Sequence, residues 1–545
     1  MHSSTVQSAS ILGCNVLIVG GGPAGFAAAL MLAKRGWSEI TVVEKRSTAQ
    51  DYEPDKSFNY MIDGRGQKFT DLLEITDKLA AIGVPSSEFY LTRIEANGDR
   101  KTLKVPLIDS NRKTAYWVPR RAFVQMLYQE IQQHWTAQIT VRFNTRCTAI
   151  NKVRQWDGER LEVTIEGGEP DSVQRLEPRL LIGCDGVQSI VRSTLNTWDQ
   201  SGRFEMQSFP SPSSGLRYKV LSLPPNFPLD AAGKEQTVST MSYAIRGAFR
   251  QRKQALSLGL LPLKDPQAPR TANLVNRPDH YLWQLKTGEA VQNFLERAFP
   301  QLPMRQILSP EEADRFAQSK GGSFPTPQFC SGLYYRLSAA AEPKKSIRES
   351  IRESTHEGTR ELTHEGTREG TFESTHGGTH EINSETTHET TYETASGVLL
   401  LGDAIHCFPP DIGQGVNSAL EDVVVLHQVL AEEGDDWERS LSRYEQVRSP
   451  DVHAVVRLVQ VAAPWQYRQD WWRGKLWAIG FAVRLGLSKV LPWIHPPAFF
   501  LVQNHQLSYQ EIWRRTQSTT RILIGMGVIG LAGLLGIAMI IGSIQ

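Results

Sequence analysis

The chain has 545 residues, and its 59 basic side chains nearly balance its 58 acidic ones. A net charge of +1 gives no field that would attract nucleic acid, so nucleic-acid binding is not expected. The length is sufficient for several domains. Five cysteines without a C-x-x-C pair predict reduced structural thiols in a cytosolic protein, not a disulfide framework or a zinc site. The first residues lack a basic region followed by an apolar core, so a cleaved signal peptide is not expected.

The first informative stretch ends at Glu44. Val16–Val19 predict a buried strand of a parallel sheet, and Phe26–Arg35 predict a helix. Between them a G-x-G-x-x-G spacing is formed by Gly20, Gly22 and Gly25. This spacing allows a tight turn, the approach of a pyrophosphate to the backbone, and close packing of helix on strand. A second strand, Ile40–Val43, places Glu44 where a carboxylate could accept hydrogen bonds from a ribose diol, so the segment predicts a bound dinucleotide.

The next region predicts a helix over Lys68–Ile82 and a change of sheet after it. Residues 89–118 alternate apolar and polar side chains around Asn97-Gly98, which predicts a hairpin in a second, antiparallel sheet. Arg120 then stands at the entrance of a predicted helix, Ala122–His134. Its guanidinium could reach a phosphate or remain solvated, and the spacing leaves both interpretations open.

A second predicted strand, Leu180–Ile182, ends in the dipeptide Asp185-Gly186. Ser189 and Arg192 follow on a predicted helix. A carboxylate and a glycine at the carboxyl end of a buried strand are typical of a ligand crevice in an α/β sheet.

A third predicted strand, Val398–Leu401, ends at Gly402-Asp403. A loop with two prolines then leads to a predicted helix over Ser418–Glu432, and its start contains Gly413, Gly415 and Asn417. Such a helix start offers backbone amides to a phosphate or to a polarised ring. His406 could be catalytic, but no acid or nucleophile stands beside it in the sequence, which favours a packing role.

The three motifs together resemble the FAD-dependent aromatic hydroxylase family, whose pattern is G-x-G-x-x-G, then D-G, then G-D. Within that family the chain is most similar to the kynurenine hydroxylases, through the runs RYKVLSLPP (Arg217–Pro225), GDAIHCFPPDIGQGVNSALED (Gly402–Asp422) and RSPDVHAVVRL (Arg448–Leu458). The resemblance implies an α/β fold in which a doubly wound FAD-binding domain, like that of p-hydroxybenzoate hydroxylase, is joined to a substrate domain with an antiparallel sheet.

The resemblance also implies the cofactors and the site. FAD would be reduced by NADPH or NADH, and O2 would then be used to hydroxylate an aromatic substrate. The implied cofactor-binding residues are Gly20, Gly22, Gly25, Glu44, Lys45, Arg120, Asp185, Gly186, Gly402, Asp403, Pro410, Gly413, Gly415 and Asn417. Pro410 and Asn417 would lie near the flavin ring, no side chain is identified as certainly catalytic, and no metal is expected.

The sequence departs from the kynurenine hydroxylases where those enzymes hold their amino-acid substrate with an arginine and two tyrosines. Those positions align with Leu91 or a neighbour, with Leu107, and with Val461 or Ala463. Leucine and valine cannot neutralise a carboxylate, and an unpaired buried carboxylate is costly. Asp411-Ile412 also replaces aromatic residues in the loop before Gly413. A less polar aromatic or isoprenoid-like substrate is therefore expected.

A tetrapeptide array fills the chain between Ser346 and Thr394, with glutamate at nearly every fourth position. It is rich in Thr, Ser and Gly and poor in apolar residues, so it predicts a disordered insert that could not bury a core. Its five histidines alternate irregularly with other residues, which argues against a metal site.

The C-terminal part of the chain suggests a membrane. Residues 451–503 combine tryptophan with arginine and lysine, which suits either helices at a membrane interface or a Trp-rich core. Ile522–Ile544 is an uncharged stretch of 23 residues, long enough for a transmembrane helix. Arg514, Arg515 and Arg521 precede it, so a tail anchor with a cytoplasmic catalytic body is expected.

These observations predict interleaved domains. The FAD-binding domain would comprise residues 13–70, 115–198 and 395–432, the substrate domain 71–114 and 199–339, the disordered insert 340–394, a helical region 433–514, and the transmembrane helix 522–544. The expected function is an FAD-dependent NAD(P)H monooxygenase whose partners are a small aromatic molecule, O2 and a membrane. Two alternatives stay open: a flavin reductase or epoxidase acting on a membrane-dissolved isoprenoid, and a non-enzymatic flavin-binding membrane scaffold.

Overall fold

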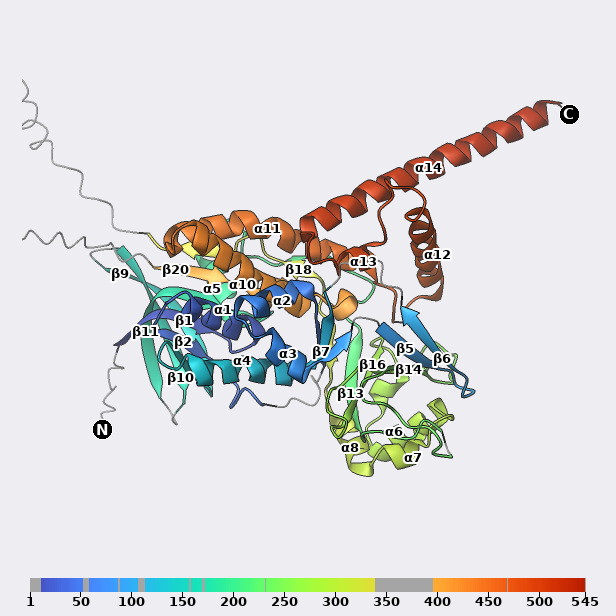
Figure 1. The fold of residues 1–545 in the computed structure, drawn as a ribbon, viewed down its shortest axis with the longest axis horizontal. Coiled ribbons are helices and arrows are strands. Elements are labelled where there is room, and N and C mark those ends of the chain that lie inside the picture. Colours follow the sequence, from blue (N-terminus) through green and yellow to red (C-terminus); the bar gives the residue numbers. More distant parts are fainter. Residues whose placement is uncertain are drawn as a thin grey trace, which may run out of the picture.

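The structure is a computed structural model, and it describes residues 11–51, 58–86, 89–105, 113–155, 158–168, 172–230, 232–338, 396–467 and 469–544. Two β-sheet bodies lie side by side, and the C-terminal helices cover one side of the molecule (Figure 1). The predicted insert 340–394 with its five histidines, and also Leu107, lie outside the described residues.

The larger sheet has eight strands, and five parallel strands form its centre in the order β20-β11-β1-β2-β8. These are β20 (Gly397–Leu400), β11 (Val173–Gly183), β1 (Ile11–Val19), β2 (Ile40–Val43) and β8 (Ile139–Arg142). Antiparallel strands extend it, namely β19 (Tyr334–Arg336), β9 (Thr145–Gln155) and β10 (Gly158–Gly167). The chain runs from β1 to β2 in one direction and returns to β11 on the other side of β1. This reversal creates a crevice at the carboxyl ends of β1 and β11, where α/β sheets bind ligands.

Helix α1 (Pro23–Lys34) packs against α4 (Arg120–His134) and α10 (Gly415–Glu432). Every residue of α1 from Ala24 to Ala33 is buried. The predicted strand, glycine turn and helix at the start of the chain are thus confirmed as elements, and they form the centre of the larger core.

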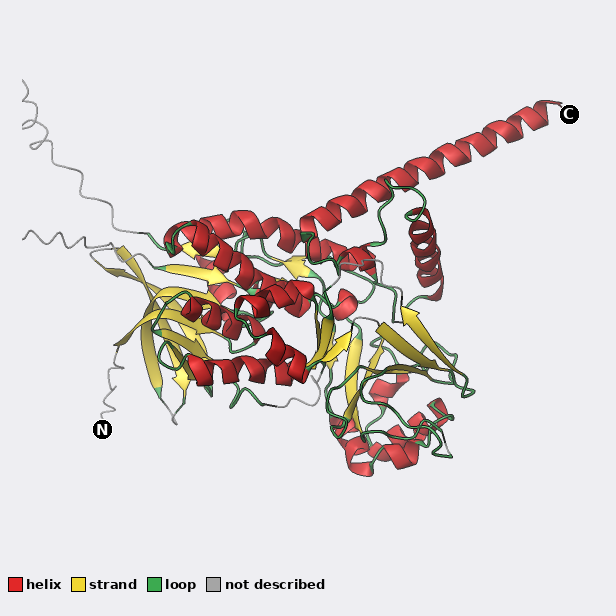
Figure 2. Cartoon of the chain, viewed as in Figure 1, coloured by secondary structure: helices red, strands yellow, loops and turns green. Residues whose placement is uncertain are grey.

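The second sheet has seven strands in the order β17-β13-β16-β15-β14-β5-β6. Their bounds are β17 (Gly322–Ser323), β13 (Arg217–Leu223), β16 (Arg270–Asn276), β15 (Ser257–Leu260), β14 (Ser242–Arg246), β5 (Phe89–Ile94) and β6 (Arg100–Val105). The hairpin predicted around Asn97-Gly98 is β5–β6, and the sheet is antiparallel except between β14 and β5. Its core is completed by the helical segments η2 (Tyr281–Gln284), α6 (Gly288–Ala298), α7 (Met304–Ile307) and α8 (Pro310–Gln318), beside the sheet in Figure 2.

Two small sheets complete the described strands. One contains β3 (Asn59–Ile62), β7 (Ala115–Pro119) and β4 (Val84–Ser86), and the other contains β12 (Gln207–Ser208), β18 (Gln328–Phe329) and β21 (His406–Cys407).

The single helix predicted over Lys68–Ile82 is wrong, because the structure has two helices there. They are α2 (Gly64–Leu72), which begins at its cap Asp63, and α3 (Thr76–Ile82). Glu74 between them has a φ of 62°, a left-handed conformation that ends the first helix.

Four helices form the C-terminal region: α11 (Trp437–Ala462), α12 (Trp471–Leu487), α13 (Ala498–Leu501) and α14 (Tyr509–Ile544). The end of α14 projects away from the rest of the molecule (Figure 1). No helix among the described residues offers an apolar stretch of the length needed to cross a bilayer. Beyond Met526 the side chains of the predicted span 522–544 lie outside the described part. Helix α12 buries none of its residues, so tryptophan core packing is wrong for this helix.

Candidate cofactor site

The three glycines of the first motif differ in their surroundings. Gly20 has a φ of +107°, and a Cβ atom there would lie 2.4 Å from the carbonyl oxygen of Cys184. A Cβ on Gly25 would lie 1.8 Å from the carbonyl oxygen of Gly20, so only glycine allows this turn to pack on the helix. A Cβ on Gly22 would meet no atom within 4 Å. The backbone at the start of α1 therefore faces open space, which leaves room for a phosphate group.

The loops after β1, β11 and β20 meet at this point. Arg192, on α5 (Ile190–Trp198), donates to the carbonyl oxygens of Val187 and Ala404 at 2.8 and 2.7 Å and so joins the second motif to the third. A Cβ atom on Gly402 would lie 3.0 Å from the Cβ of Ala24 in the first motif. Three segments that lie far apart in the sequence are thus neighbours at the carboxyl ends of these strands.

Asp185 has a structural task in the second motif. Its Oδ2 accepts a hydrogen bond from the amide of Ile190 at 2.7 Å and thereby caps α5. Its Oδ1 is buried and has no hydrogen-bond partner among the described residues. Gly186, with a φ of +83°, makes the turn, and a Cβ there would have open space.

Asp403 follows β20 and is exposed. Desolvation of its carboxylate by the surrounding protein raises its pKa, while His406 and Arg120 act in the opposite direction. Tyr60 lies near both Asp403 and Arg120, and burial raises the pKa of its hydroxyl. Arg120 is half-buried and lines the pocket that also contains Glu44, and its contact with a phosphate stays a prediction.

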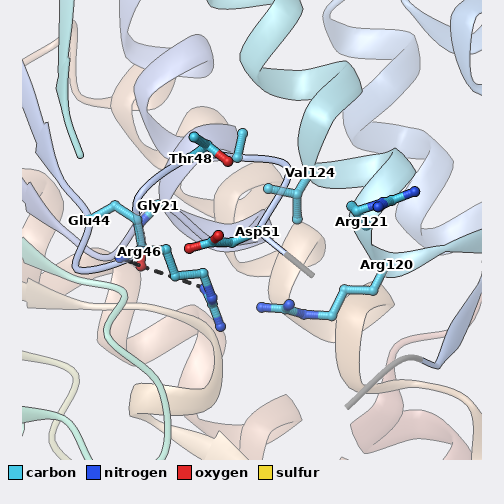
Figure 3. Close-up of a pocket in the computed structure, with 9 residues that line it drawn as sticks. Gly21, Glu44, Arg46, Thr48, Asp51, Arg120, Arg121 and Val124 are labelled. Carbon is cyan, nitrogen blue, oxygen red and sulfur yellow. Dashed lines mark hydrogen bonds and ion pairs between the residues drawn. The ribbon is translucent and has the colours of Figure 1, made fainter. Parts of the chain in front are cut away.

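Glu44 and the residues around it line a pocket (Figure 3). Its carboxylate is 5 % exposed and accepts from the amides of Gly21 at 2.7 Å and Arg46 at 2.9 Å. The guanidinium groups of Arg46 and Arg120 point into the space between the β2 loop and α4 (Figure 3). Lys45 is exposed and does not line this pocket, whereas its neighbour Arg46 does.

The third motif ends in a loop that is held by side-chain amides. Pro410 begins the short helix η4 (Pro410–Ile412), and Gly413 follows in a left-handed conformation with a φ of +65°. A Cβ on Gly415, the first residue of α10, would meet no atom within 4 Å. Asn417 is fully buried: its Oδ1 accepts from the amide of Asp63, and its Nδ2 donates to the carbonyl oxygens of Met61 and Gly413. Asn417 therefore shapes the loop and the end of β3.

A buried ionic network behind the crevice is not evident from sequence motifs. Arg448 donates to Asp422 and to Glu421, both at 2.7 Å, and Arg65 donates to the other oxygen of Glu421 at 2.5 Å. Burial acts to raise both pKa values, but Arg65 and Arg448 hold the pKa of Glu421 below its usual value, and His406 together with Arg448 does the same for Asp422. Asp422 also accepts from the amide of Gly402 at 2.7 Å and lies 3.0 Å from Nε2 of the fully buried His406. The acid Asp422 and the hydroxyl of Ser418, 3.4 Å from Nε2, therefore stand beside His406 in the folded chain, and its packing role stays a prediction.

A second chain of hydrogen bonds links the C-terminal helix to the same loop. The hydroxyl of Tyr509 donates to Oε1 of Gln414 at 2.7 Å, and Nε2 of Gln414 donates to Oδ2 of Asp63 at 2.7 Å. The guanidinium of Arg65 lies 4.0 Å from the centre of the Tyr509 ring. No local pattern could reveal this link, because its members lie on three distant segments.

These features fit a bound dinucleotide. A buried carboxylate could accept from a ribose, two guanidinium groups and an open helix start could hold phosphates, and the glycine loop before α10 leaves room for a flat ring. Of the positions expected to contact the substrate, Leu91 lies in β5, Val461 is 41 % exposed and Ala463 is buried.

Comparisons with known proteins agree with this geometry. A sequence profile described as "FAD binding domain" matches residues 13–214 and 291–459. The chain is 23 % identical over 463 residues to a kynurenine 3-monooxygenase of Dictyostelium discoideum, which covers 81 % of this chain and 78 % of that protein. It is 44 % identical to the kynurenine 3-monooxygenase of Flavobacterium psychrophilum over 61 residues, or 11 % of this chain and only 14 % of that enzyme.

Its fold is also similar to that of aklavinone-11 hydroxylase in a ternary complex with FAD and aklavinone. The TM-score is 0.53 at 17 % identity, over 83 % of this chain and 69 % of the hydroxylase. This likeness supports the α/β flavoprotein fold.

Proposed function

Because the chain belongs to the FAD binding domain family, we propose that it is an NAD(P)H- and O2-dependent monooxygenase that hydroxylates an aromatic substrate at a membrane face. Its cofactor is FAD. The observation that carries the proposal is the convergence of the loops after β1, β11 and β20 on one crevice. Similarity to kynurenine 3-monooxygenases over most of the chain supports the reaction type.

We assign the adenosine end of FAD to the pocket around Glu44. Glu44 accepts from the amides of Gly21 and Arg46, and the guanidinium of Arg46 lies 3.6 Å from its Oε1, so the remaining lone pairs of the carboxylate would accept from the ribose hydroxyls. Arg46 and Arg120 would neutralise the pyrophosphate, and the open backbone at Gly22 would donate to it. Asp403 would accept from a ribityl hydroxyl, since its carboxylate is exposed to the crevice.

The flavin ring would lie beside the loop from Pro410 to Gly415. When bound, the flavin supplies hydride acceptance from the nicotinamide and activation of O2. The protein orients the two reactants and excludes water. Asn417 and Gln414 are positioning residues, because their side-chain bonds go to protein groups and fix the loop.

The membrane face is assigned from α12. Trp471, Trp472, Leu476, Ile479 and Val483 are each more than half exposed on this helix. Lys475 lies 3.9 Å from the centre of the Trp471 ring, which is a typical combination of cation and aromatic ring at a membrane interface. The end of α14 projects beyond the body and would serve as the tail anchor over residues 522–544.

The membrane assignment is tested with vesicles of neutral and anionic phospholipid. Trp472→Glu together with Ile479→Glu should reduce co-sedimentation of a chain truncated after Arg521 by roughly tenfold, since each glutamate loses apolar contact and is repelled by anionic lipid. The matched control is Val238→Glu, because Val238 is 52 % exposed on the substrate domain. Equal sedimentation of both variants would contradict the assignment of α12.

The monooxygenase proposal is tested with the full chain in detergent or vesicles, loaded with FAD. Oxidation of NADPH or NADH should accelerate when an aromatic substrate is added, and the product should contain one oxygen atom from ¹⁸O2. Oxidation of NADPH with a product that lacks ¹⁸O would support a reductase instead. A flavin-loaded protein that oxidises no nicotinamide with any aromatic compound would contradict the proposal.

A further inference from the structure

Asp411 is a buried carboxyl group whose hydrogen-bonding capacity is only partly used. It lies in η4 and is 3 % exposed. Its Oδ2 accepts from the hydroxyl of Ser213, and its main-chain oxygen accepts from Nε2 of Gln466 at 3.0 Å. Its Oδ1 is buried and accepts no hydrogen bond from the described residues. A buried oxygen that accepts no hydrogen bond destabilises the fold unless a ligand or a water molecule donates one to it.

Among the residues that the structure describes, no cation is paired with this carboxyl group. The described groups that face it are the hydroxyl of Ser213, the amide of Gln466 and the ring of Tyr467, and none of them is positively charged. Burial raises the pKa of Asp411 to about 7, and the two hydrogen-bonding neighbours offset only part of this effect. An N–H or O–H group from a ligand is the partner that this site lacks.

Aromatic rings continue from Asp411 into the substrate domain. Burial and the nearby charge of Asp411 raise the pKa of Tyr467. The ring of Tyr467 lies 5.3 Å from that of Phe324 at an angle of 70°, and Phe324 lies 5.7 Å from the ring of Tyr218 on β13. An aromatic ligand could pack near these rings with a polar substituent directed at the carboxyl group.

The position of Asp411 relative to the flavin rests on the proposed function. Asp411 precedes Gly413 and Gly415, and a Cβ on Gly415 would meet no atom within 4 Å on the side assigned to the flavin ring. A substrate placed on this side of the ring would meet the η4 loop, and Asp411 is the acidic residue of that loop.

We propose that Asp411 is a specificity-determining residue that selects a substrate whose aromatic ring carries a hydroxyl or amino donor, which binds at Oδ1. The carboxylate accepts one hydrogen bond from this donor while Ser213 occupies the other oxygen. An electron-donating hydroxyl or amino group also activates an aromatic ring toward hydroxylation. The substituent that Asp411 would bind is therefore also the one that makes the ring reactive.

Phenol and its methyl ether anisole form a matched pair of probes, since only phenol can donate. Their binding to the FAD-loaded protein is measured by calorimetry without nicotinamide. Wild-type protein should bind phenol at least roughly tenfold more tightly than anisole. Asp411→Leu should remove most of this difference, because it should lower the affinity for phenol while the affinity for anisole changes by no more than about twofold. Asp411→Asn, which keeps the shape of the side chain, should weaken phenol by about threefold, because an amide accepts a weaker hydrogen bond than a carboxylate.

Ile412→Val is the control, because it shortens the adjacent buried side chain without changing its polarity. It should change the affinities for phenol and anisole by the same factor. Equal binding of phenol and anisole to wild type, or an unchanged preference in both Asp411 variants, would overturn the proposal. Calorimetry reports binding whether or not nicotinamide is oxidised. Loss of turnover therefore counts against the proposed function, and loss of the phenol preference counts against the role of Asp411.

Discussion

Three buried carboxyl groups on one continuous segment differ in whether a cation is paired with them. Glu421 and Asp422, on α10, share Arg448, and Glu421 is also paired with Arg65. Asp411, in the preceding loop, is buried to a similar extent, but the described groups that face it are all neutral. The pKa of each paired carboxyl is lowered, while that of Asp411 is raised. The carboxyl groups that fix the scaffold are thus paired with cations, whereas the carboxyl group where a ligand is expected has no cation among the described residues.

The largest expected effect is the loss of the shared cation. Arg448→Met would leave Glu421 with Arg65 alone and Asp422 with His406 alone, so this buried network would lose one cation and the free energy of unfolding should fall by roughly 3–5 kcal/mol. Arg443→Met on the same helix is the matched control, since its pair with Glu432 is about half exposed and should contribute less than about 1 kcal/mol. Urea unfolding measures both changes, and similar values for the two variants would contradict the structural role of the network.

Asp411→Asn should give the next largest effect, and its size should depend on pH. The pKa of Asp411 is about 7 in the folded protein, against 3.8 as its ordinary value. Between these values the folded protein retains a proton that the unfolded chain has lost, so stability falls as pH rises through this window. The asparagine variant has no carboxyl group to titrate, so its stability does not fall in this window. Its free energy of unfolding relative to that of wild type should therefore rise by up to about 4 kcal/mol between pH 4 and pH 8.

Urea unfolding of wild type and Asp411→Asn at both pH values provides the test. A difference in stability between them that does not change with pH would mean that the carboxyl group is paired after all.

Tyr509→Phe should have a smaller effect. It removes the donor to Gln414 and leaves a buried amide oxygen unsatisfied, which should cost about 1–3 kcal/mol in thermal or urea unfolding. The ring under Arg65 is retained, so Tyr509→Leu should cost more. The absorbance of the bound flavin should shift in both variants, because Gln414 also holds Asp63. An unchanged flavin spectrum would show that the C-terminal helix does not position this loop.

Deletion of the tetrapeptide array, residues 346–394, should have the smallest effect. The strands on either side are already in register, with Arg336 paired to Gly397. A shorter connection lowers the entropy cost of closing this loop, so stability should rise by about 1 kcal/mol or less. FAD affinity should not change, and its loss on deletion would assign the array a role in the cofactor site.

The sequence was sufficient for the parts of the molecule that depend on local patterns. The glycine turn before α1 and the short strand β20 follow from periodicity and spacing over a few residues. The break at Glu74 was missed, because a left-handed glutamate has no glycine or proline signal.

The buried contacts behind the site join residues that no local sequence pattern connects. Arg65 meets Glu421, Gln414 meets Tyr509, and Ser213 meets Asp411, each across a long stretch of chain. These pairings depend on how sheets and helices pack. The residue types were visible in the sequence, whereas their pairing was not.

The central claim is that the crevice holds FAD with its adenosine half at Glu44, and a titration of flavin-free protein with FAD and with FMN tests it directly. FMN lacks the adenosine, so FAD should bind at least roughly a hundredfold more tightly, and Glu44→Gln should weaken FAD about tenfold without affecting FMN. Equal affinities for the two flavins, or no binding of either, would contradict the assignment of the crevice.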